Sequence, residues 1–151
     1  RTRSMNVFHD LSFEHHPEFV PYTERKYYRK FFPKYADKAV RIATVSEFSK
    51  RDIIQKYHQK SEKIDVVYNG AGDFFRPLPD REKIAVREKF TEGDAYFIYV
   101  GSLHPSKNIE NLLRAFDLFR KETGSPVKLL LVGQKMFLAS TIGQTLDDME
   151  Y

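Results

Sequence analysis

Residues 96–133 hold an apolar run, an amphipathic stretch and a second apolar run in direct succession. The runs Tyr96–Val100 and Val127–Val132 have the length and the side chains of buried strands. Between them, Asn108–Thr123 carries apolar side chains at helical spacing, which predicts a helix that lies on a sheet. Such a succession forms two parallel strands joined by a crossover helix. This part of the chain is therefore expected to adopt an α/β fold.

The first half of the sequence shows a similar alternation. Pro33 is expected to kink the first helix or to begin a new turn, because it has no N–H to donate. Ser46 is the predicted N-cap of the second helix, and Asn69-Gly70 is a turn signal. The remaining predicted strands are Met5–Phe8, Lys38–Val45 and Ile64–Tyr68, and the remaining predicted helices are Tyr22–Phe32, Glu47–His58, Lys83–Phe90 and Phe137–Met149.

Residues 69–80 contain two Gly and two Pro and are the best candidate for a domain boundary. We therefore place one domain portion at residues 1–76 and another at residues 77–151. A complete doubly wound sheet has about five or six strands, and each portion has fewer predicted strands than that. The predicted fold class is α/β, with portions of two Rossmann-like parallel-sheet domains.

Composition and charge exclude several classes of protein. The sequence contains no Cys, which excludes a thiol nucleophile and a Cys-based zinc site. Its longest apolar runs are far shorter than the roughly 20 residues of a membrane span. Residues 1–76 hold 15 Lys and Arg against 10 Asp and Glu, whereas residues 77–151 hold 10 against 11. The basic first half indicates either an anionic partner or a solvated surface.

The loop Gly101–Asn108 connects the carboxyl end of a predicted strand to the start of a helix. Ligands of α/β proteins bind at this edge of the sheet, and a helix N-terminus with an adjacent Lys107 suits a phosphate. The loop matches neither the Walker A nor the GxGxxG pattern, so an ordinary connecting loop remains the alternative. Gly133 follows the next strand, and its backbone is expected either to line the same crevice or to form a plain turn.

His9 and Asp10 follow the first predicted strand, also at a carboxyl edge, where a His can exchange protons with a ligand. His15, His16, Glu14 and Glu18 lie nearby, but their spacing matches no standard zinc motif. No metal site is therefore predicted.

Tyr22–Arg41 combines aromatic and basic side chains at steps of four residues. Such a helix suits an anionic membrane surface or a nucleic acid. The alternative is a helix whose aromatic side chains pack on the sheet while its lysines face water, and we expect this for the aromatic side chains. The aromatic residues are Tyr27, Phe31, Tyr35, Tyr28 and Phe32, and the basic residues are Arg25, Lys26, Arg29, Lys30, Lys34 and Lys38.

The segments Tyr99–Ile109, Leu112–Phe116 and Leu129–Gly133 follow each other in the second half of the sequence. They resemble the start of the C-terminal domain of the retaining glycosyltransferases of family 4, also called glycosyl transferase group 1, which have the GT-B fold. Upstream, the sequence resembles the second half of the family's N-terminal domain, and the likeness is strongest to its mannosyltransferases. The upstream segments are Val7–Phe13, His16–Glu18, Thr44–Ser49 and Val66–Gly70.

The resemblance implies a nucleotide-sugar donor, with GDP-mannose as one candidate, and no separate cofactor or essential metal. It implies a glycan or lipid-linked acceptor, retention of configuration and a cytoplasmic enzyme at the inner face of the membrane. Lys107 matches the family's diphosphate-binding Lys, whereas Ser102 stands where the family has Arg. Gly101 and Asn108 complete the expected phosphate loop, and Gly133 is expected at the nucleotide. His9, with Asp10, matches the catalytic His position beside the reacting sugar carbon.

The family's Gly-rich acceptor loop and its Glu-x7-Glu motif do not occur in this sequence. We therefore expect the 151-residue chain alone to be catalytically inactive. Open sheet edges in such a chain also favour a dimer. The competing hypothesis is a basic α/β module that binds nucleic acid through residues 25–63, which hold 12 Lys and Arg against 4 Asp and Glu.

Overall fold

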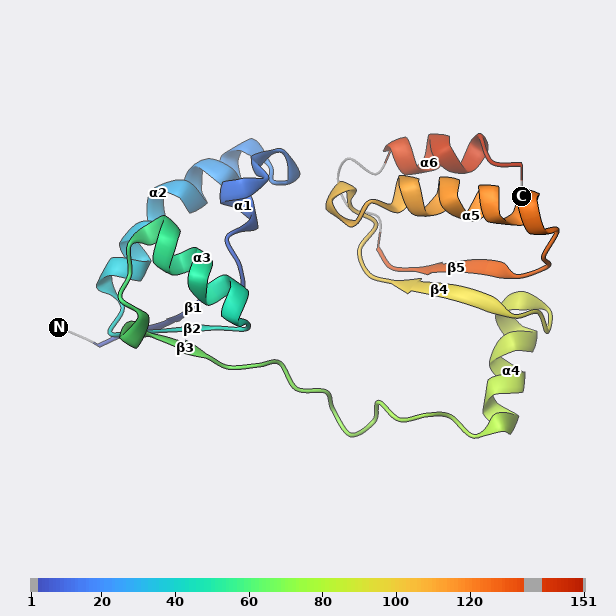
Figure 1. The fold of residues 1–151 in the computed structure, drawn as a ribbon, viewed down its shortest axis with the longest axis horizontal. Coiled ribbons are helices and arrows are strands. Elements are labelled where there is room, and N and C mark those ends of the chain that lie inside the picture. The colour runs from blue at the N-terminus through green and yellow to red at the C-terminus, as the bar shows by residue number, and fades with distance from the viewer. Residues whose placement is uncertain (1–2, 135–139, 151) are drawn as a thin grey trace. The chain divides into compact units, whose positions relative to one another are not determined.

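The computed structural model describes residues 3–134 and 140–150. The chain divides into two compact units, Arg1–Phe75 (unit 1) and Arg76–Tyr151 (unit 2), in which helices and strands alternate (Figure 1). The elements of unit 1 are β1 (Met5–Val7), α1 (Ser12–His15), α2 (Tyr22–Lys38), β2 (Arg41–Thr44), α3 (Glu47–Tyr57) and β3 (Ile64–Val66), with short 3-10 turns at Pro17–Phe19 and Ser61–Lys63. The elements of unit 2 are α4 (Asp80–Thr91), β4 (Tyr96–Val100), a 3-10 turn at Pro105–Lys107, α5 (Ile109–Thr123), β5 (Lys128–Val132) and α6 (Ser140–Asp147).

The sheet of unit 1 has the order β1-β2-β3, and both of its pairings are parallel. Helices α1, α2 and α3 cover one face of this sheet (Figure 1). On the opposite face, the β1 side chains of Met5 and Val7 stay exposed. The central strand is buried throughout Ile42–Thr44, as its nearly continuous apolar sequence predicts. The predicted parallel α/β arrangement is confirmed for this unit.

The core of unit 1 lies between the sheet and the three helices. It is built from side chains that are almost inaccessible to solvent, and each large one contributes roughly 1.5–3 kcal/mol through burial. The members of the core are Phe8, Leu11, Phe13, Ala36, Ala39, Ile42, Ile53, Tyr57 and Ile64.

Helix α2 does not end before Pro33, contrary to the sequence expectation; it continues to Lys38 with Pro33 inside it. Packing on both sides of the proline explains the difference. Phe32 stacks on the ring of Phe8 at 5.2 Å between centroids, and Ala36 is fully buried in the core. These contacts hold both halves of the helix on the sheet, and they offset a penalty of about 3 kcal/mol for an interior proline.

Only one of the two aromatic columns of α2 packs on the core, so our expectation for all the aromatic side chains is wrong. Tyr28 and Phe32 contact the core. Tyr27, Phe31 and Tyr35 lie on the neighbouring side of the helix, where Tyr27 and Tyr35 are 46% and 37% exposed. A helix face of this width cannot turn both columns towards one sheet.

The longer α2 also shortens the next strand, because residues up to Lys38 remain helical and β2 begins only at Arg41. The predicted turn at Asn69-Gly70 is wrong, since the turn lies at Asp73-Phe74, closed by a bond from the Phe75 N–H to the Gly72 carbonyl (3.0 Å). Residues 67–79 contain no helix or strand and are exposed.

In unit 2, β4 and β5 pair in parallel along their whole length, from Tyr96 opposite Lys128 to Val100 opposite Val132. Helix α5 lies along this pair and α6 packs on α5 (Figure 1). The predicted strand–helix–strand unit is confirmed. The first residues of the predicted helix Phe137–Met149 lie outside the described residues, and α6 covers Ser140–Asp147. Within the described residues, no helix combines the length and apolar character needed to cross a membrane.

Candidate functional site

The loop after β4 in unit 2 continues the pairing of the two strands beyond their ends. The Gly101 N–H donates to the Val132 carbonyl, and the Leu103 N–H donates to the Gln134 carbonyl, both at 2.9 Å. The loop is therefore held beside the end of β5. This places it at the carboxyl edge of the parallel pair, where α/β proteins bind ligands.

Two side chains, Leu103 of the loop and Tyr99 of β4, hold the loop in place. Leu103 is buried against Ile109 and Leu113 of α5. The Tyr99 hydroxyl donates to the Ser102 carbonyl at 3.0 Å. Because this bond uses the backbone carbonyl of Ser102, it does not depend on the Ser102 side chain.

The second half of the loop is a 3-10 turn that begins after His104. The Ser106 N–H donates to Nδ1 of His104 at 3.2 Å, and the Ser106 hydroxyl also contacts Nδ1 at 2.8 Å. Because Nδ1 accepts from the backbone, the neutral His104 ring carries its proton on Nε2. His104 thus serves as the N-cap of the turn, a role that the sequence interpretation missed. Its place directly before Pro105 was the available signal.

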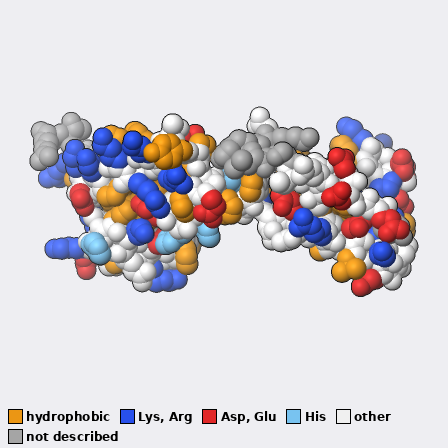
Figure 2. Space-filling view, turned by 90° about the horizontal axis from the view of Figure 1, so that it is seen from above, with side chains coloured by type: hydrophobic (Ala, Val, Ile, Leu, Met, Phe, Trp, Pro, Cys, Tyr) orange, Lys and Arg blue, Asp and Glu red, His pale blue; other side chains and the backbone are white. Residues whose placement is uncertain are grey.

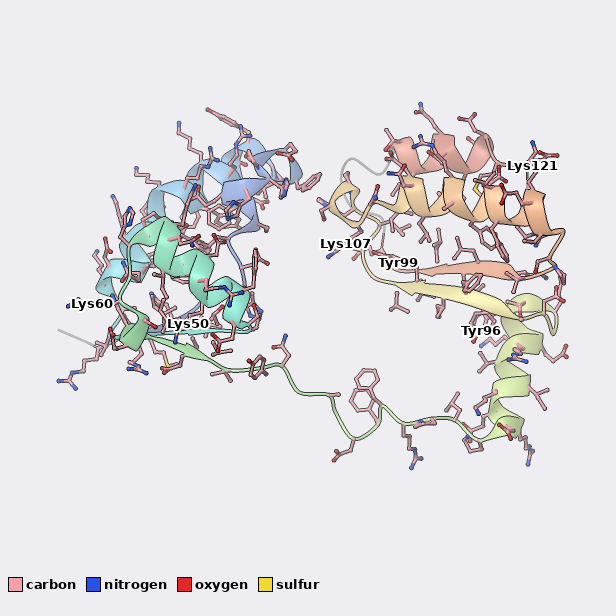
Figure 3. All side chains as sticks on the ribbon, in the orientation of Figure 1. Lys50, Lys60, Tyr96, Tyr99, Lys107 and Lys121 are labelled. Atoms are coloured by element: carbon pink, nitrogen blue, oxygen red, sulfur yellow. The ribbon has the colours of Figure 1, made fainter. Side chains whose placement is uncertain are left out.

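The turn brings Lys107 to the amino end of α5. Lys107 is exposed, and it forms no ion pair with any residue that the structure describes. Asn108 adopts the left-handed conformation, with φ of 56°, and its side chain accepts from Asn111 rather than capping α5. Figure 3 shows Lys107 and Lys121 at opposite ends of α5. Positive charge and a helix amino end without a side-chain cap therefore coincide, which suits a phosphate.

Gly133 lies directly against this loop. A Cβ on Gly133 would be 1.7 Å from the Gly101 carbonyl oxygen and 2.7 Å from its carbon. The structure thus places Gly133 against Gly101 and the Ser102 N–H, while Lys107 and Asn108 lie further along the same loop. The close approach adds a steric reason for the glycine itself.

In unit 1, His9 and Asp10 lie after β1, at the carboxyl edge of the sheet, and both are exposed. The Asp10 carboxylate accepts the Ser12 N–H at 2.8 Å, so part of its bonding capacity serves the start of α1. The Phe8 N–H donates to the Ala43 carbonyl, which extends the strand pairing to the residue before His9.

The carbonyl of His9 is fixed by a residue forty positions away. The hydroxyl of Ser49, 5% exposed, donates to the His9 carbonyl at 2.9 Å. Ser46 caps α3 by accepting the Ser49 N–H at 3.1 Å, which confirms the predicted N-cap, and its hydroxyl also contacts that of Ser49. The amino end of α3 therefore positions the His9 backbone. No local pattern reveals this long-range bond.

Two further His residues of unit 1, His15 and His16, each lie beside a carboxylate. Nε2 of His15 lies 2.8 Å from Oδ1 of Asp52, and Nδ1 of His16 lies 3.1 Å from Oε1 of Glu18. A bond to its own backbone, followed by the His16 contact, lowers the pKa of Glu18 below its usual value. In residues 3–134 and 140–150, no three His, Asp or Glu side chains are placed to hold a metal ion.

Two α/β units with parallel sheets, each with a loop at the carboxyl edge, have the architecture of parts of the Rossmann-like domains of a GT-B protein. A model described as Glycosyltransferase Family 4 matches residues 1–71, and one described as Glycosyl transferases group 1 matches residues 80–147. Together with the relatives described next, these matches show that the chain belongs to the group 1 glycosyltransferase family.

Two curated proteins match nearly the whole chain. O-antigen chain mannosyltransferase B of Escherichia coli is 31% identical over 134 residues, which make up 88% of this chain and 35% of that protein. O-antigen chain mannosyltransferase RfbU of Salmonella typhimurium is 26% identical over 152 positions, covering 99% of this chain and 37% of that protein. The chain thus spans just over a third of the length of these relatives.

Proposed function

We propose that this chain belongs to an enzyme that transfers a hexose, with retention, from a nucleotide-sugar donor to a glycan or lipid-linked acceptor. Mannose from GDP-mannose is the leading candidate, since both relatives carry the name of an O-antigen chain mannosyltransferase. The donor is a substrate, and no separate cofactor takes part. Both halves of the chain match the family, and this favours transfer over the alternative of a nucleic-acid-binding module.

The observation that carries the proposal is the position of Lys107 at the amino end of α5. When the bond between sugar and diphosphate breaks, negative charge develops on the departing diphosphate. The Lys107 ammonium and the first N–H groups of α5 stabilise that charge, which lowers the barrier. The wall of this diphosphate site is formed by Gly101, Ser102 and Asn108. The backbone of Gly133 borders the nucleotide.

His9 is proposed to act beside the reacting sugar carbon, with Asp10 next to it in the chain. Its ring is exposed, whereas its carbonyl is held by the buried hydroxyl of Ser49. A backbone held in this way limits the positions of the ring without using its nitrogens. Those nitrogens remain available to a sugar hydroxyl.

The same proposal includes the partners of the whole enzyme. It acts at the cytoplasmic face of a membrane, with peripheral contact to anionic lipid, and it does not bind nucleic acid. Within the described residues, β1, β3, β4 and β5 each have one edge without a neighbouring strand, which also favours association of two copies of this chain.

A ³¹P NMR titration of GDP-mannose tests the donor site through the diphosphate itself. The wild-type chain should broaden the diphosphate signals, and Lys107→Ala should weaken binding about tenfold, through the loss of one charge-assisted contact. Lys121→Ala is the matched control, because it removes a lysine from the opposite end of the same helix (Figure 3).

Ser102→Arg is the reciprocal variant. It restores the charge that family members carry at this position, and the Tyr99 bond to the Ser102 carbonyl does not involve the substituted side chain. We expect binding to become about tenfold tighter. Equal broadening by the wild type, Lys107→Ala and Ser102→Arg would contradict a donor site in this loop.

A further inference from the structure

Four lysines form one row on the outer side of α2. Lys26, Lys30, Lys34 and Lys38 follow each other at intervals of four residues and are all exposed. At 1.5 Å per residue the row is ~18 Å long. The side of the helix that faces the core carries Tyr28, Phe32 and Ala36 instead. Figure 2 shows Lys and Arg side chains gathered over unit 1, with hydrophobic side chains between them.

The lysines of this row are not paired with carboxylates in the part of unit 1 that the structure describes. Across the described parts of the chain, none of the four ammonium groups forms an ion pair. Arg29, on the same helix, does pair with Glu14, at 3.3 Å. The Asp37 carboxylate, near the end of the row, accepts from the buried Gln59 side chain. Four positive charges in one row, outside any ion pair in the described residues, are complementary to an anionic surface.

An aromatic column runs beside the lysines. The rings of Tyr27 and Phe31 lie 4.7 Å apart, those of Phe31 and Tyr35 lie 6.1 Å apart, and the two tyrosine hydroxyls are 2.8 Å apart. The ammonium groups of Lys30 and Lys34 lie 5.3 and 5.8 Å from the centroid of the Phe31 ring. Apolar rings with polar tips beside cations are typical of surfaces that rest in the headgroup layer of a membrane.

The packing of the rings distinguishes lipid from nucleic acid. Proteins that hold single strands offer open ring faces on which bases stack. Here the faces of Phe31 are taken by its neighbouring tyrosines and by two ammonium groups. The central ring of the column is therefore not open to a stacking base, whereas apolar rings beside ammonium groups suit headgroups and the upper parts of acyl chains.

We propose that Lys26, Lys30, Lys34 and Lys38, with the column Tyr27, Phe31 and Tyr35, form a docking surface for an anionic phospholipid bilayer. Helix α2 lies flat on the membrane, with the lysines at the phosphate groups and the rings at the interface. This assigns residues to the peripheral contact named under the proposed function. It does not depend on sugar transfer, because Lys107 lies in the other unit.

Vesicle co-sedimentation tests the lysine row. The chain should bind vesicles of phosphatidylcholine with about 30 mol% phosphatidylglycerol, and salt should weaken the binding. Each lysine contributes about a fivefold factor, so a variant with all four changed to Gln should bind on the order of several hundredfold more weakly. The matched control loses equal charge elsewhere in unit 1, through Gln at Lys50, Arg51, Lys56 and Lys60, and should stay within about threefold of the wild type.

A tryptophan reporter tests the aromatic column. The chain contains no Trp, so Tyr27→Trp introduces a single one. Its emission should shift to the blue and become protected from acrylamide on anionic vesicles. Tyr68→Trp, at a residue of the exposed segment 67–79 that is itself 70% exposed, is the control and should show neither change.

Three results would overturn the proposal: equal losses in the two Gln variants, equal binding to vesicles of phosphatidylcholine alone, or no lipid protection of the Trp at position 27. A duplex oligonucleotide that binds through the same lysines, without lipid protection of that Trp, would identify a nucleic-acid surface instead. Failure of vesicle binding together with intact GDP-mannose binding would reject the docking surface and leave the donor site standing.

Discussion

Gly101 and Gly133 pack backbone against backbone at the ends of β4 and β5, with the Gly133 α-carbon turned towards the Gly101 carbonyl oxygen. A Cβ added to Gly133 would lie 1.7 Å from that oxygen, a distance that requires the backbone to move. The loop Gly101–Asn108 therefore keeps its position only while residue 133 lacks a side chain.

Gly133→Ala should destabilise unit 2 by about 1–3 kcal/mol, since overpacking against backbone has no soft neighbour to displace. Urea unfolding followed by circular dichroism measures the loss. Gly143→Ala is the control: it lies within α6 with no atom within 4 Å of the added Cβ, and it should stabilise the chain by about 0.5–1 kcal/mol. Equal stability of the two variants would contradict the close approach.

Ser49→Ala removes the donor that holds the His9 carbonyl. We expect a loss of about 1–2 kcal/mol in the free energy of unfolding, because a partly buried carbonyl is left without its partner. The amide resonances of His9 and Asp10 should shift with it. Ser61→Ala, at an exposed serine of the same unit, should change neither quantity. Unchanged His9 resonances in Ser49→Ala would show that the bond does not position this residue.

Lys63 closes the carboxyl end of α2. Its ammonium donates to the carbonyls of Ala36 (2.6 Å) and Asp37 (3.2 Å) and to the side chain of Gln59 (2.9 Å). Lys63→Met keeps the aliphatic stem and removes three donors, so unfolding should cost about 1–2 kcal/mol less. The matched change Lys60→Met, at an exposed lysine, should have little effect on the free energy of unfolding. An equal loss in both variants would show that the three bonds of Lys63 do not stabilise the end of α2.

Tyr57 should make the chain sensitive to alkaline pH. Burial, followed by the charge of Glu14 and a bond to its carboxylate, raises the pKa of Tyr57 far above its ordinary value. The protonated phenol is thus favoured in the folded state, while an unfolded tyrosine ionises near pH ~10. The stabilisation is complete below that pH and is lost as the pH rises above it.

Phenolate absorbance and urea unfolding at increasing pH measure this directly. In Tyr57→Phe the decline of stability above pH ~10 should be smaller than in the wild type, although the variant loses the Glu14 bond at neutral pH. The phenolate absorbance that the wild type gains with the raised pKa of Tyr57 should also be missing. Ionisation of Tyr57 near pH ~10 in the folded chain would contradict this account.

The sequence predicts the elements whose pattern is local. The strand Tyr96–Val100 is confirmed at both ends, and the α5 stripe and the Ser46 cap are confirmed as well. Each depends on neighbouring residues alone: an apolar run, a helical repeat, or a hydroxyl before a helix.

The predicted and observed structures differ where contacts between residues far apart in the sequence determine the conformation. Local rules end α2 at Pro33, but the contacts of Phe32 and Ala36 with the core keep the helix intact. The two aromatic columns of α2 are equivalent in the sequence, and only the position of the sheet separates them. The bond from Ser49 to His9 crosses forty residues, so no spacing in the sequence reveals it.

The most direct test of the donor site is an amide NMR map of this chain with GDP-mannose. We predict chemical-shift changes that centre on Gly101–Asn108 and Gly133 and grow with ligand concentration. The affinity obtained from them should fall about tenfold in Lys107→Ala and stay unchanged in Lys121→Ala. Shifts elsewhere in the chain, or shifts in this loop that survive the loss of Lys107 unchanged, would contradict a diphosphate site at the amino end of α5.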